Sequence, residues 1–325
     1  MSEFVHATVM LRETVEAVLG WRAQEQAPTA PRSGGVYVDV TLGGAGHAHA
    51  ILEASAPDGV LYGIDRDPAA LAAARERLAP FGARAIVLHG TFGSVRTLLE
   101  EHGVSRVDGL VADLGVSSPQ LDRDERGFSF ARPGPLDMRM DPSSDEPLSE
   151  LLERLSAEEL ADVIYEYGDE RKSRPIARSI KAAVERNELQ TTEDLRRAVI
   201  RVTGPKRTGV DPATRTFQAL RMAVNEEIQQ LETLLASLPD LLEDGGRAAI
   251  ISFHSGEDRL VKQAFRDDAR LRPLTKKPVV AGEVEQADNA RSRSAKLRAA
   301  ERIARADEDT SDSEQGTRRY GREAP

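Results

Sequence analysis

Residues 36–47 read VYVDVTLGGAGH, the pattern of a buried strand that breaks into a glycine-rich turn and then begins a helix. A second apolar run, residues 60–64, leads directly into Asp65. Glycines in such a turn let the backbone approach a ligand, and a carboxylate about 20 residues further on accepts hydrogen bonds from ribose hydroxyls. Together the two segments predict a pocket for a nucleoside-bearing cofactor.

The residues before the glycines indicate which cofactor this is. In the dinucleotide fingerprint the strand runs directly into G-x-G-x-x-G, and a pyrophosphate lies at the helix N-terminus. Here Asp39 ends the apolar strand, and Thr41 and Leu42 come before Gly43. Because a carboxylate repels phosphate and attracts a sulfonium or ammonium group, Asp39 favours S-adenosylmethionine over NAD. An NAD oxidoreductase is the least favoured alternative.

Composition limits the class of protein. The chain of 325 residues is long enough for one large domain and a smaller one. It has no cysteine, which excludes disulfides, thiolate nucleophiles and thiolate metal sites. No apolar run approaches the ~20 residues of a membrane span, and the first residues lack a signal-peptide pattern. We therefore expect a cytoplasmic protein without a membrane partner.

The net charge of −10 is unevenly distributed. Acidic residues crowd 307–314, which predicts a disordered acidic tail over 304–325. Basic residues cluster at 171–174, from Arg196-Arg197 through Lys206-Arg207, and at 291–298. Solvated helix faces account for each cluster equally well, but three of them in one acidic chain make contact with a polyanion plausible.

Strands and helices alternate through the first third of the chain, which predicts a parallel sheet covered on both faces. The expected strands are 36–39, 60–64, 85–88 and 107–112, and a fifth strand over 247–253 follows a segment that ends at Gly245-Gly246. Two helix starts are also expected, with Asp67 as a cap before Pro68 and with a Ser156-x-x-Glu159 capping box. From 120 to 207 only helices are expected, and a single helix with an apolar stripe follows Asp211-Pro212 as far as Leu238. We therefore predict an α/β, Rossmann-like domain over 1–119 and 208–303, with a helical insertion over 120–207.

The carboxyl ends of the predicted strands collect polar residues. In open α/β sheets, ligands bind beyond those ends, where the strand order reverses. This rule brings five groups of residues to one crevice: Asp39 with the turn 43–47, Asp65, residues 89–92, Asp113 to Gln120, and His254-Ser255.

Several longer motifs resemble the bacterial small-subunit ribosomal RNA (cytosine-N4) methyltransferases of the RsmH/MraW type. The resemblance spans roughly residues 6–303, apart from residues 23–33, and the long, unusual strings make it specific. They are DVTLGGAGH (39–47), GIDRDP (63–68), DLGVSSPQ (113–120), RGFSF (126–130), LDMRMD (136–141), TRTFQALR (214–221), SFHSGEDR (252–259) and RSRSAKLR (291–298). The family's glycine turn usually reads Gly-Gly-Gly-His-Ser, and this chain has Ala45 and Ala48 in it, where the methyl group of Ala45 narrows the approach to the backbone. The departures at Gly256 and Ala290 remove no polar group.

The resemblance implies a Rossmann-like class I fold, S-adenosylmethionine as cofactor and a cytidine N4 in the decoding region of 16S ribosomal RNA as the methyl acceptor. Its partner would be the small ribosomal subunit, and a homodimer is left open. It also implies which residues contact the cofactor: Ala45, Gly46, His47, Asp65, Phe92, Asp113 and Gln120.

Chemistry supports the same assignment. A sulfonium is already a good methyl donor, so alignment does most of the work, and no metal is expected. An acceptor such as Asp113, its backbone carbonyl or the Ser117 hydroxyl would hold an N–H of the weakly nucleophilic cytosine amine. Residues expected to contact RNA or the flipped base are Gln218, Arg221, Asn225, His254, Arg291 and Arg293.

Two further alternatives stay open. A methyltransferase acting on a small-molecule or protein amine would share the crevice without needing the basic clusters. A non-catalytic assembly factor would bind S-adenosylmethionine or RNA without turnover.

Overall fold

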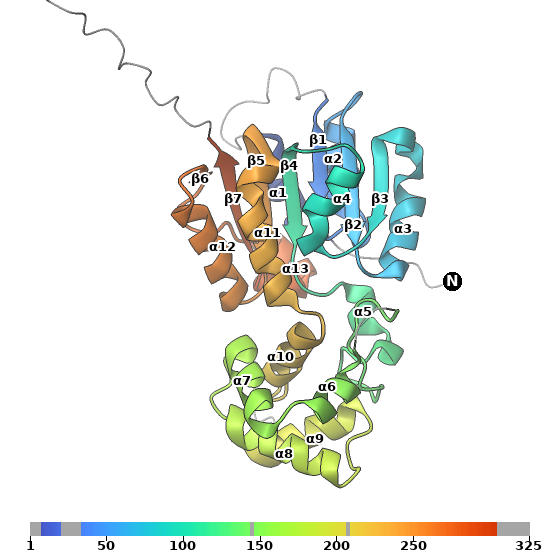
Figure 1. Cartoon of the computed structure of the whole chain (residues 1–325), viewed down its shortest axis with the longest axis vertical. Helices are drawn as coiled ribbons and strands as arrows, with labels where there is room; N and C mark the ends of the chain where they lie inside the picture. Colours follow the sequence, from blue (N-terminus) through green and yellow to red (C-terminus); the bar gives the residue numbers. More distant parts are fainter. Residues whose placement is uncertain (1–7, 21–33, 144–145, 206–208, 304–325) are drawn as a thin grey trace, which may run out of the picture.

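The computed structural model describes residues 8–20, 34–143, 146–205 and 209–303. The predicted acidic tail at 304–325, the segment 23–33 and the basic residues Lys206 and Arg207 lie outside these ranges. A sheet-containing part and a helical part make up the molecule (Figure 1). No helix of the described ranges is long and apolar enough to cross a membrane.

The sheet has seven strands in the order β3-β2-β1-β4-β5-β7-β6. Five of them run parallel: β1 (Val36–Asp39), β2 (Val60–Asp65), β3 (Ala85–His89), β4 (Val107–Asp113) and β5 (Leu242–Ser252). At the other edge β7 (Lys296–Arg302) pairs antiparallel with both β5 and the short β6 (Leu271–Pro273). The α/β, Rossmann-like fold is confirmed, whereas this antiparallel edge was not predicted.

Helices cover both faces of the sheet. One face packs against α1 (Leu11–Leu19), α2 (Gly46–Ala54) and α3 (Pro68–Leu78), and the other against α4 (Val95–Glu101), α11 (Glu227–Leu241) and α12 (Ser255–Asp267). Neighbouring strand residues alternate between the two cores, since Tyr37 and Val111 lie in the first and Val38 and Leu110 in the second. Burial on both faces explains why the strands read as continuous apolar runs.

The helical part has its own core. Its helices are the short α5 (Ser118–Asp122), α6 (Leu148–Arg154), α7 (Ala157–Gly168), α8 (Ser173–Glu185), α9 (Thr192–Thr203) and α10 (Thr214–Val224). The predicted capping box that begins α7 is confirmed, because Ser156 and Glu159 bond each other's backbone amides. Phe217, Leu220 and Val224 of α10 belong to this core. Thus α10 packs with the helical part, although the sequence assigned it to the Rossmann-like domain.

The prediction of a single helix from Asp211 to Leu238 is wrong. The chain forms two helices, α10 and α11, and between them Glu226 adopts a left-handed conformation with φ 51°. The Asn225 side chain donates to the Met138 carbonyl and accepts from the Met140 amide, both at 2.8 Å. Apolar spacing continues across the interruption, so periodicity could not reveal it.

Strand β5 begins five residues earlier than predicted. Gly245 and Gly246 were predicted to end the segment before the strand. Gly245 instead lies inside the strand, with φ 78°. The pairing of β4 with β5 shifts register near this point, between Val107 and Gly109. A glycine bulge inside the strand accounts for the misplaced boundary.

Asp67 links the sheet-containing part to the helical part. Its Oδ1 caps α3 by accepting from the Ala69 amide at 2.9 Å, as the sequence predicted. Its Oδ2 accepts from Gln120 Nε2 at 2.9 Å and from Arg126 Nη1 at 3.0 Å. Arg126 also donates to the carbonyls of Arg139 and Met140. One buried carboxylate therefore holds α3, α5 and the loop that leads to α6.

We predict that Asp67→Ala lowers the free energy of unfolding by about 3 kcal/mol or more, because it removes a helix cap and leaves the largely buried Arg126 guanidinium, 13% exposed, without its carboxylate. Urea unfolding with an unchanged slope measures the loss. Arg197→Ala, which removes the exposed pair with Asp194, is the control and should cost less than about 1 kcal/mol. Equal costs for the two variants would contradict the role of Asp67.

Candidate functional site

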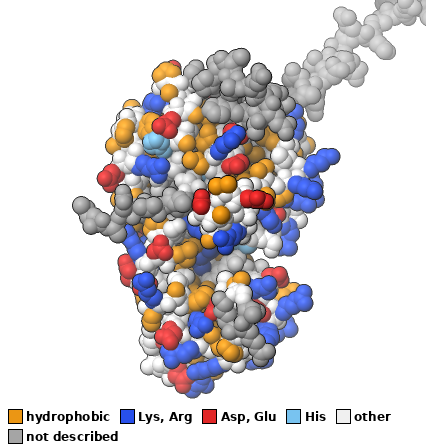
Figure 2. Space-filling model, turned by 180° about the vertical axis from the view of Figure 1, so that it is seen from behind, with side chains coloured by type: hydrophobic (Ala, Val, Ile, Leu, Met, Phe, Trp, Pro, Cys, Tyr) orange, Lys and Arg blue, Asp and Glu red, His pale blue; other side chains and the backbone are white. Residues whose placement is uncertain are grey.

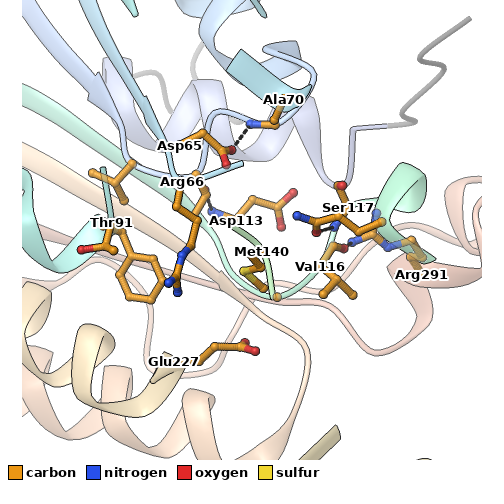
Figure 3. Close-up of a pocket in the computed structure, with 16 residues that line it drawn as sticks. Asp65, Arg66, Ala70, Thr91, Asp113, Val116, Ser117, Met140, Glu227 and Arg291 are labelled. Carbon is orange, nitrogen blue, oxygen red and sulfur yellow. Dashed lines mark hydrogen bonds between the residues drawn. The ribbon is translucent and has the colours of Figure 1, made fainter. Parts of the chain in front are cut away.

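A crevice lies at the carboxyl ends of β1, β2 and β4, where the topology rule placed it. Figure 3 shows Asp65 and Asp113 in this crevice, with Ser117, Val116 and Arg291 on the side beyond Asp113. The crevice is lined by Val40, Thr41, Gly43, Asp65, Arg66, Ala70, Thr91, Phe92, Asp113, Gly115, Val116, Ser117, Gln120, Met140, Glu227 and Arg291.

Asp65 holds the glycine turn in place. Its Oδ2 accepts from the Gly43 amide at 2.7 Å and its Oδ1 from the Asp67 amide at 2.8 Å. A carboxylate has about four acceptor positions, so capacity remains for hydroxyl donors from the crevice. Burial raises the pKa of Asp65 to about 6, and the charge of Asp67 adds to this shift. Asp65 and Gly43 thus both occupy the positions expected of cofactor contacts.

Asp39 lies beneath the turn and does not line the crevice. Its side chain is 1% exposed and accepts from the Thr41 amide at 3.2 Å. Burial raises the pKa of Asp39 to about 7, with further contributions from the charges of Asp113 and Asp65. Asp39 therefore organises the turn and adds negative potential from below, rather than offering a direct contact.

The second half of the turn also faces away from the crevice. Ala45 is fully buried and precedes α2 with φ 57°. A Cβ on Gly46 would meet the Thr8 hydroxyl, and His47 Nε2 bonds the Val9 carbonyl at 3.0 Å. The side-chain positions of these three residues are thus adapted to the N-terminal segment at 8–10, and none of the three lines the crevice.

Asp113 carries an unsatisfied atom into the crevice. The hydroxyl of Thr41 accepts from its amide at 2.6 Å, which fixes the backbone where β4 ends. Its Oδ1 is buried and has no hydrogen-bond partner among the described residues. Burial raises the pKa of Asp113 to about 7, against the lowering effect of Arg291. A buried acceptor without a donor fits an N–H group of a ligand.

Arg291 is partly buried and lines one side of the crevice. It donates to the Val116 carbonyl and to Ser118 Oγ, and its guanidinium lies 5.6 Å from the centre of the Phe253 ring. The sequence grouped Arg291 with Arg293 as RNA contacts. Arg293 instead is exposed, donates to the Gln286 carbonyl at 2.9 Å and lines neither this crevice nor the pocket beside it.

Gln120 and Ser117 lie at the start of α5. Gln120 Oε1 accepts from the Ser117 amide at 2.9 Å, and its Nε2 donates to Asp67. The amide of Gln120 is therefore engaged within the protein on both sides. Both residues line the crevice, as does Phe92 at the beginning of the short 3-10 turn Phe92–Ser94.

A second cavity of about 460 Å³, here called the aromatic pocket, adjoins the crevice and shares Gly115, Val116 and Arg291 with it. Four phenylalanines line it, with polar groups between them. The rings are those of Phe128, Phe130, Phe217 and Phe253, and the polar or charged side chains include Ser129, Thr214, Gln218, Arg221, His254, Glu257, Arg291 and Ser294. Aromatic faces with a few placed polar groups are the composition of a site for a planar base.

Protein contacts fix the polar side chains of the aromatic pocket. Arg221 forms a two-point ion pair with Glu227, at 2.7 and 2.8 Å. His254 caps α12 by accepting at Nδ1 from the Gly256 and Glu257 amides, and its Nε2 lies 3.1 Å from Glu257 Oε1. Although burial alone would raise the pKa of Glu257, hydrogen bonding to His254 holds it below the usual range.

Asn225 differs from its neighbours on α10. Its side chain is 1% exposed and lines neither cavity. Both its amide oxygen and its amide nitrogen bond the backbone of the 138–140 loop. The structure therefore gives this residue a structural place and not one facing a ligand.

Six lining residues were not singled out from the sequence: Val40, Thr41, Arg66, Ala70, Met140 and Glu227. Val40 and Thr41 lie between Asp39 and Gly43, and Arg66 directly follows Asp65, so the same strand-end rule could have found them. Met140 and Glu227 reach the crevice only because of the helix interruption at Asn225, which has no local signal.

Comparison with known proteins gives this geometry a family. The model of the MraW methylase family matches residues 3–303. A protein of Sorangium cellulosum named ribosomal RNA small subunit methyltransferase H is 56% identical, over 92% of this chain and 91% of its own. Proteins of the same name from Citrifermentans bemidjiense and Geobacter sulfurreducens are each 49% identical, over 93% and 92% of this chain and 100% and 99% of theirs. The chain therefore belongs to the MraW methylase family.

Proposed function

We propose that this chain is an S-adenosylmethionine-dependent methyltransferase that methylates the N4 amine of a cytidine in the decoding region of 16S ribosomal RNA. The carrying observation is the buried, unpartnered Oδ1 of Asp113, which lines the crevice two residues before Gly115, a residue that the crevice shares with the aromatic pocket, in a chain of the methylase family. Relatives named ribosomal RNA small subunit methyltransferase H support the choice of substrate.

The crevice fits the cofactor. Asp65 has acceptor capacity for ribose hydroxyls, Gly43 allows close approach of the backbone, and Phe92 offers a ring beside the adenine. Gln120 and Asp113 would lie near the reacting end. Ala45, Gly46, His47 and Asp39 would act indirectly by shaping the turn. S-adenosylmethionine supplies an electrophilic methyl group on a positively charged sulfur.

Asp113 and its neighbours would control the acceptor amine. The lone pair of the cytosine amine is delocalised into the ring, so the amine is a poor nucleophile until an acceptor holds one of its hydrogens. Asp113 Oδ1 is placed for that hydrogen bond, with the Ser117 hydroxyl as a second candidate. As the nitrogen bonds the methyl carbon, the bond from that carbon to sulfur would break and leave a neutral thioether. The nitrogen would then release a proton, which the Asp113 carboxylate can accept.

The aromatic pocket is our candidate for the flipped base. A base in folded RNA must leave its stack before its amine reaches the crevice, and aromatic faces replace the lost stacking. Gln218, Arg221 and His254 would line the base site. Arg291 stands at its boundary with the crevice.

Other expectations stay predictions. Among the described residues, no three His, Asp or Glu side chains are grouped so that they could hold a metal ion, and the proposed chemistry requires none. Cytoplasmic residence follows from the proposed substrate. Tritiated methyl transfer to small subunits that lack the modification, followed by nucleoside mass spectrometry, tests the two alternatives of a non-catalytic assembly role and of a small-molecule or protein substrate. Light scattering tests whether the chain forms a homodimer.

We predict that Asp113→Asn slows single-turnover methyl transfer about 100-fold or more, because it keeps the shape of the side chain but removes the charge that accepts the proton. Ser117→Ala should slow it less than about tenfold. Rapid-quench measurements with saturating cofactor and RNA separate this loss from binding. A wild-type rate for Asp113→Asn would remove Asp113 from the mechanism.

The three raised pKa values predict pH-dependent cofactor affinity. Asp65, with a pKa of about 6, and Asp39 and Asp113, with pKa values of about 7, are mostly neutral at pH 5.5 and mostly ionised at pH 7.5, where they attract a cation. Affinity for S-adenosylmethionine should therefore rise between pH 5.5 and pH 7.5, on the order of tenfold, with release of protons on binding. Calorimetry in buffers of different ionisation enthalpy measures both.

S-adenosylhomocysteine, which lacks the sulfonium charge, is the control ligand for this experiment. Its affinity should rise less over the same pH range. Identical pH profiles for the two ligands would show that the carboxylates do not sense the charge on sulfur.

A further inference from the structure

The three basic clusters of the sequence differ in how they are paired. Over the face in Figure 2, Lys and Arg side chains are interspersed with Asp and Glu, so local pairing decides which cations are available. In the middle cluster Arg196 pairs with Asp211 at 2.8 Å and Arg197 with Asp194 at 2.6 Å. The cations of this cluster that the structure describes are thus largely neutralised by the protein itself.

The third cluster is built into the sheet-containing part. Arg298 is 8% exposed in β7 and pairs with Asp258 at 2.7 Å, and Lys296 lies 3.6 Å from the same carboxylate. Arg291 is held by the Val116 carbonyl and Ser118. The two cations of this cluster that lie in β7 are therefore paired within the protein.

The first cluster differs from both. We define the α8 cluster as Arg171, Lys172, Arg174 and Arg178, all of them exposed. Within the described ranges, none of their side chains forms an ion pair with a carboxylate. Arg174 and Arg178 are four residues apart on α8 and therefore share one helix face. Asp169 and Glu170 precede the cluster, and Glu170 accepts from the Lys172 amide at 2.8 Å. The four cations of the cluster outnumber these two carboxylates, so an excess of positive charge remains.

The α8 cluster begins at the rim of a groove that continues from the aromatic pocket. The groove is lined by residues 165–169 at the end of α7 and by 254–256 and 259–260 at the start of α12, and it shares Gln218 and His254 with the aromatic pocket. Arg171 is two residues beyond Asp169, which lines the groove. The groove itself has charges of both signs, including Glu166, Glu232 and Arg259, so it offers phosphates no net attraction.

We propose that the α8 cluster binds phosphate groups of the RNA strand that flanks the target nucleotide, after that strand has passed through the groove. This inference rests on the proposed function and adds the surface that positions the substrate. Phosphates demand cations that are not already neutralised, because RNA affinity comes largely from the release of counterions. Among the three clusters, the α8 cluster best meets that demand in the described ranges.

The test replaces Arg171, Lys172, Arg174 and Arg178 together by glutamine in the full chain. Each phosphate contact contributes about 0.7 to the log–log salt slope for single-stranded RNA, so the slope should fall by about 2 to 3. The KM for unmodified small subunits should rise about tenfold or more. The rate at saturating RNA and the affinity for S-adenosylmethionine should stay within about twofold of wild type.

A matched control removes the same charge elsewhere on the helical part. Arg154, Arg186, Arg197 and Arg201 are exposed and paired with carboxylates, so their joint replacement by glutamine should change the slope by less than about 1. An equal effect of both quadruple variants would mean a general charge effect and would overturn the proposal. So would a wild-type KM and salt slope in the α8 variant.

Two further measurements keep the test decisive. Protein-free small-subunit RNA should show the same dependence on the α8 cluster, because a dependence seen only with intact subunits would indicate a ribosomal protein as the partner and overturn the phosphate assignment. If the quadruple variant does not fold, Arg178→Glu alone should raise KM and lower the slope by about 1. If the wild-type protein did not methylate unmodified small subunits, the proposed function would be contradicted. Loss of binding in the α8 variant alone tests the surface separately.

Discussion

A buried carboxylate must be satisfied by donors, and Asp67 meets this requirement by joining the two parts of the molecule. Its partners come from α3, from Gln120 and from Arg126, while Asp65, two residues earlier, holds the glycine turn. The exit of β2 thus organises the ligand crevice and fixes the insertion with the same few residues. Other features of the site, including the position of the aromatic pocket, depend on this junction.

Electrostatics give the crevice its preference for ligands. Asp39, Asp65 and Asp113 are close enough for each to feel at least one other acidic group, and burial raises the pKa of all three. Arg291 opposes this at one end only, where it faces Asp113. Such a field suits a ligand with positive charge near the carboxylates and disfavours a pyrophosphate, which agrees with the preference inferred from Asp39 in the sequence.

Local rules predicted much of the fold and the centre of the site. The parallel strands, the Asp67 cap and the strand-end positions of Asp65 and Asp113 follow from short patterns and from the geometry of parallel sheets. The predictions that failed and the pairings that were missed concern residues whose partners are distant in the sequence. Asn225 interrupts a helix through bonds to residues more than 80 positions away, and Arg298 finds Asp258 40 positions away. Neither pairing leaves a trace in periodicity.

The helix interruption at Asn225–Glu226 also has an architectural consequence. The chain leaves the sheet after Asp113 and returns at Glu227, and both ends of this excursion border the same crevice. The helical part is therefore a module attached through two adjacent connections. Its outer surface can diverge during evolution without disturbing the strand ends that form the crevice, so the surface of the helical part and the crevice can change independently.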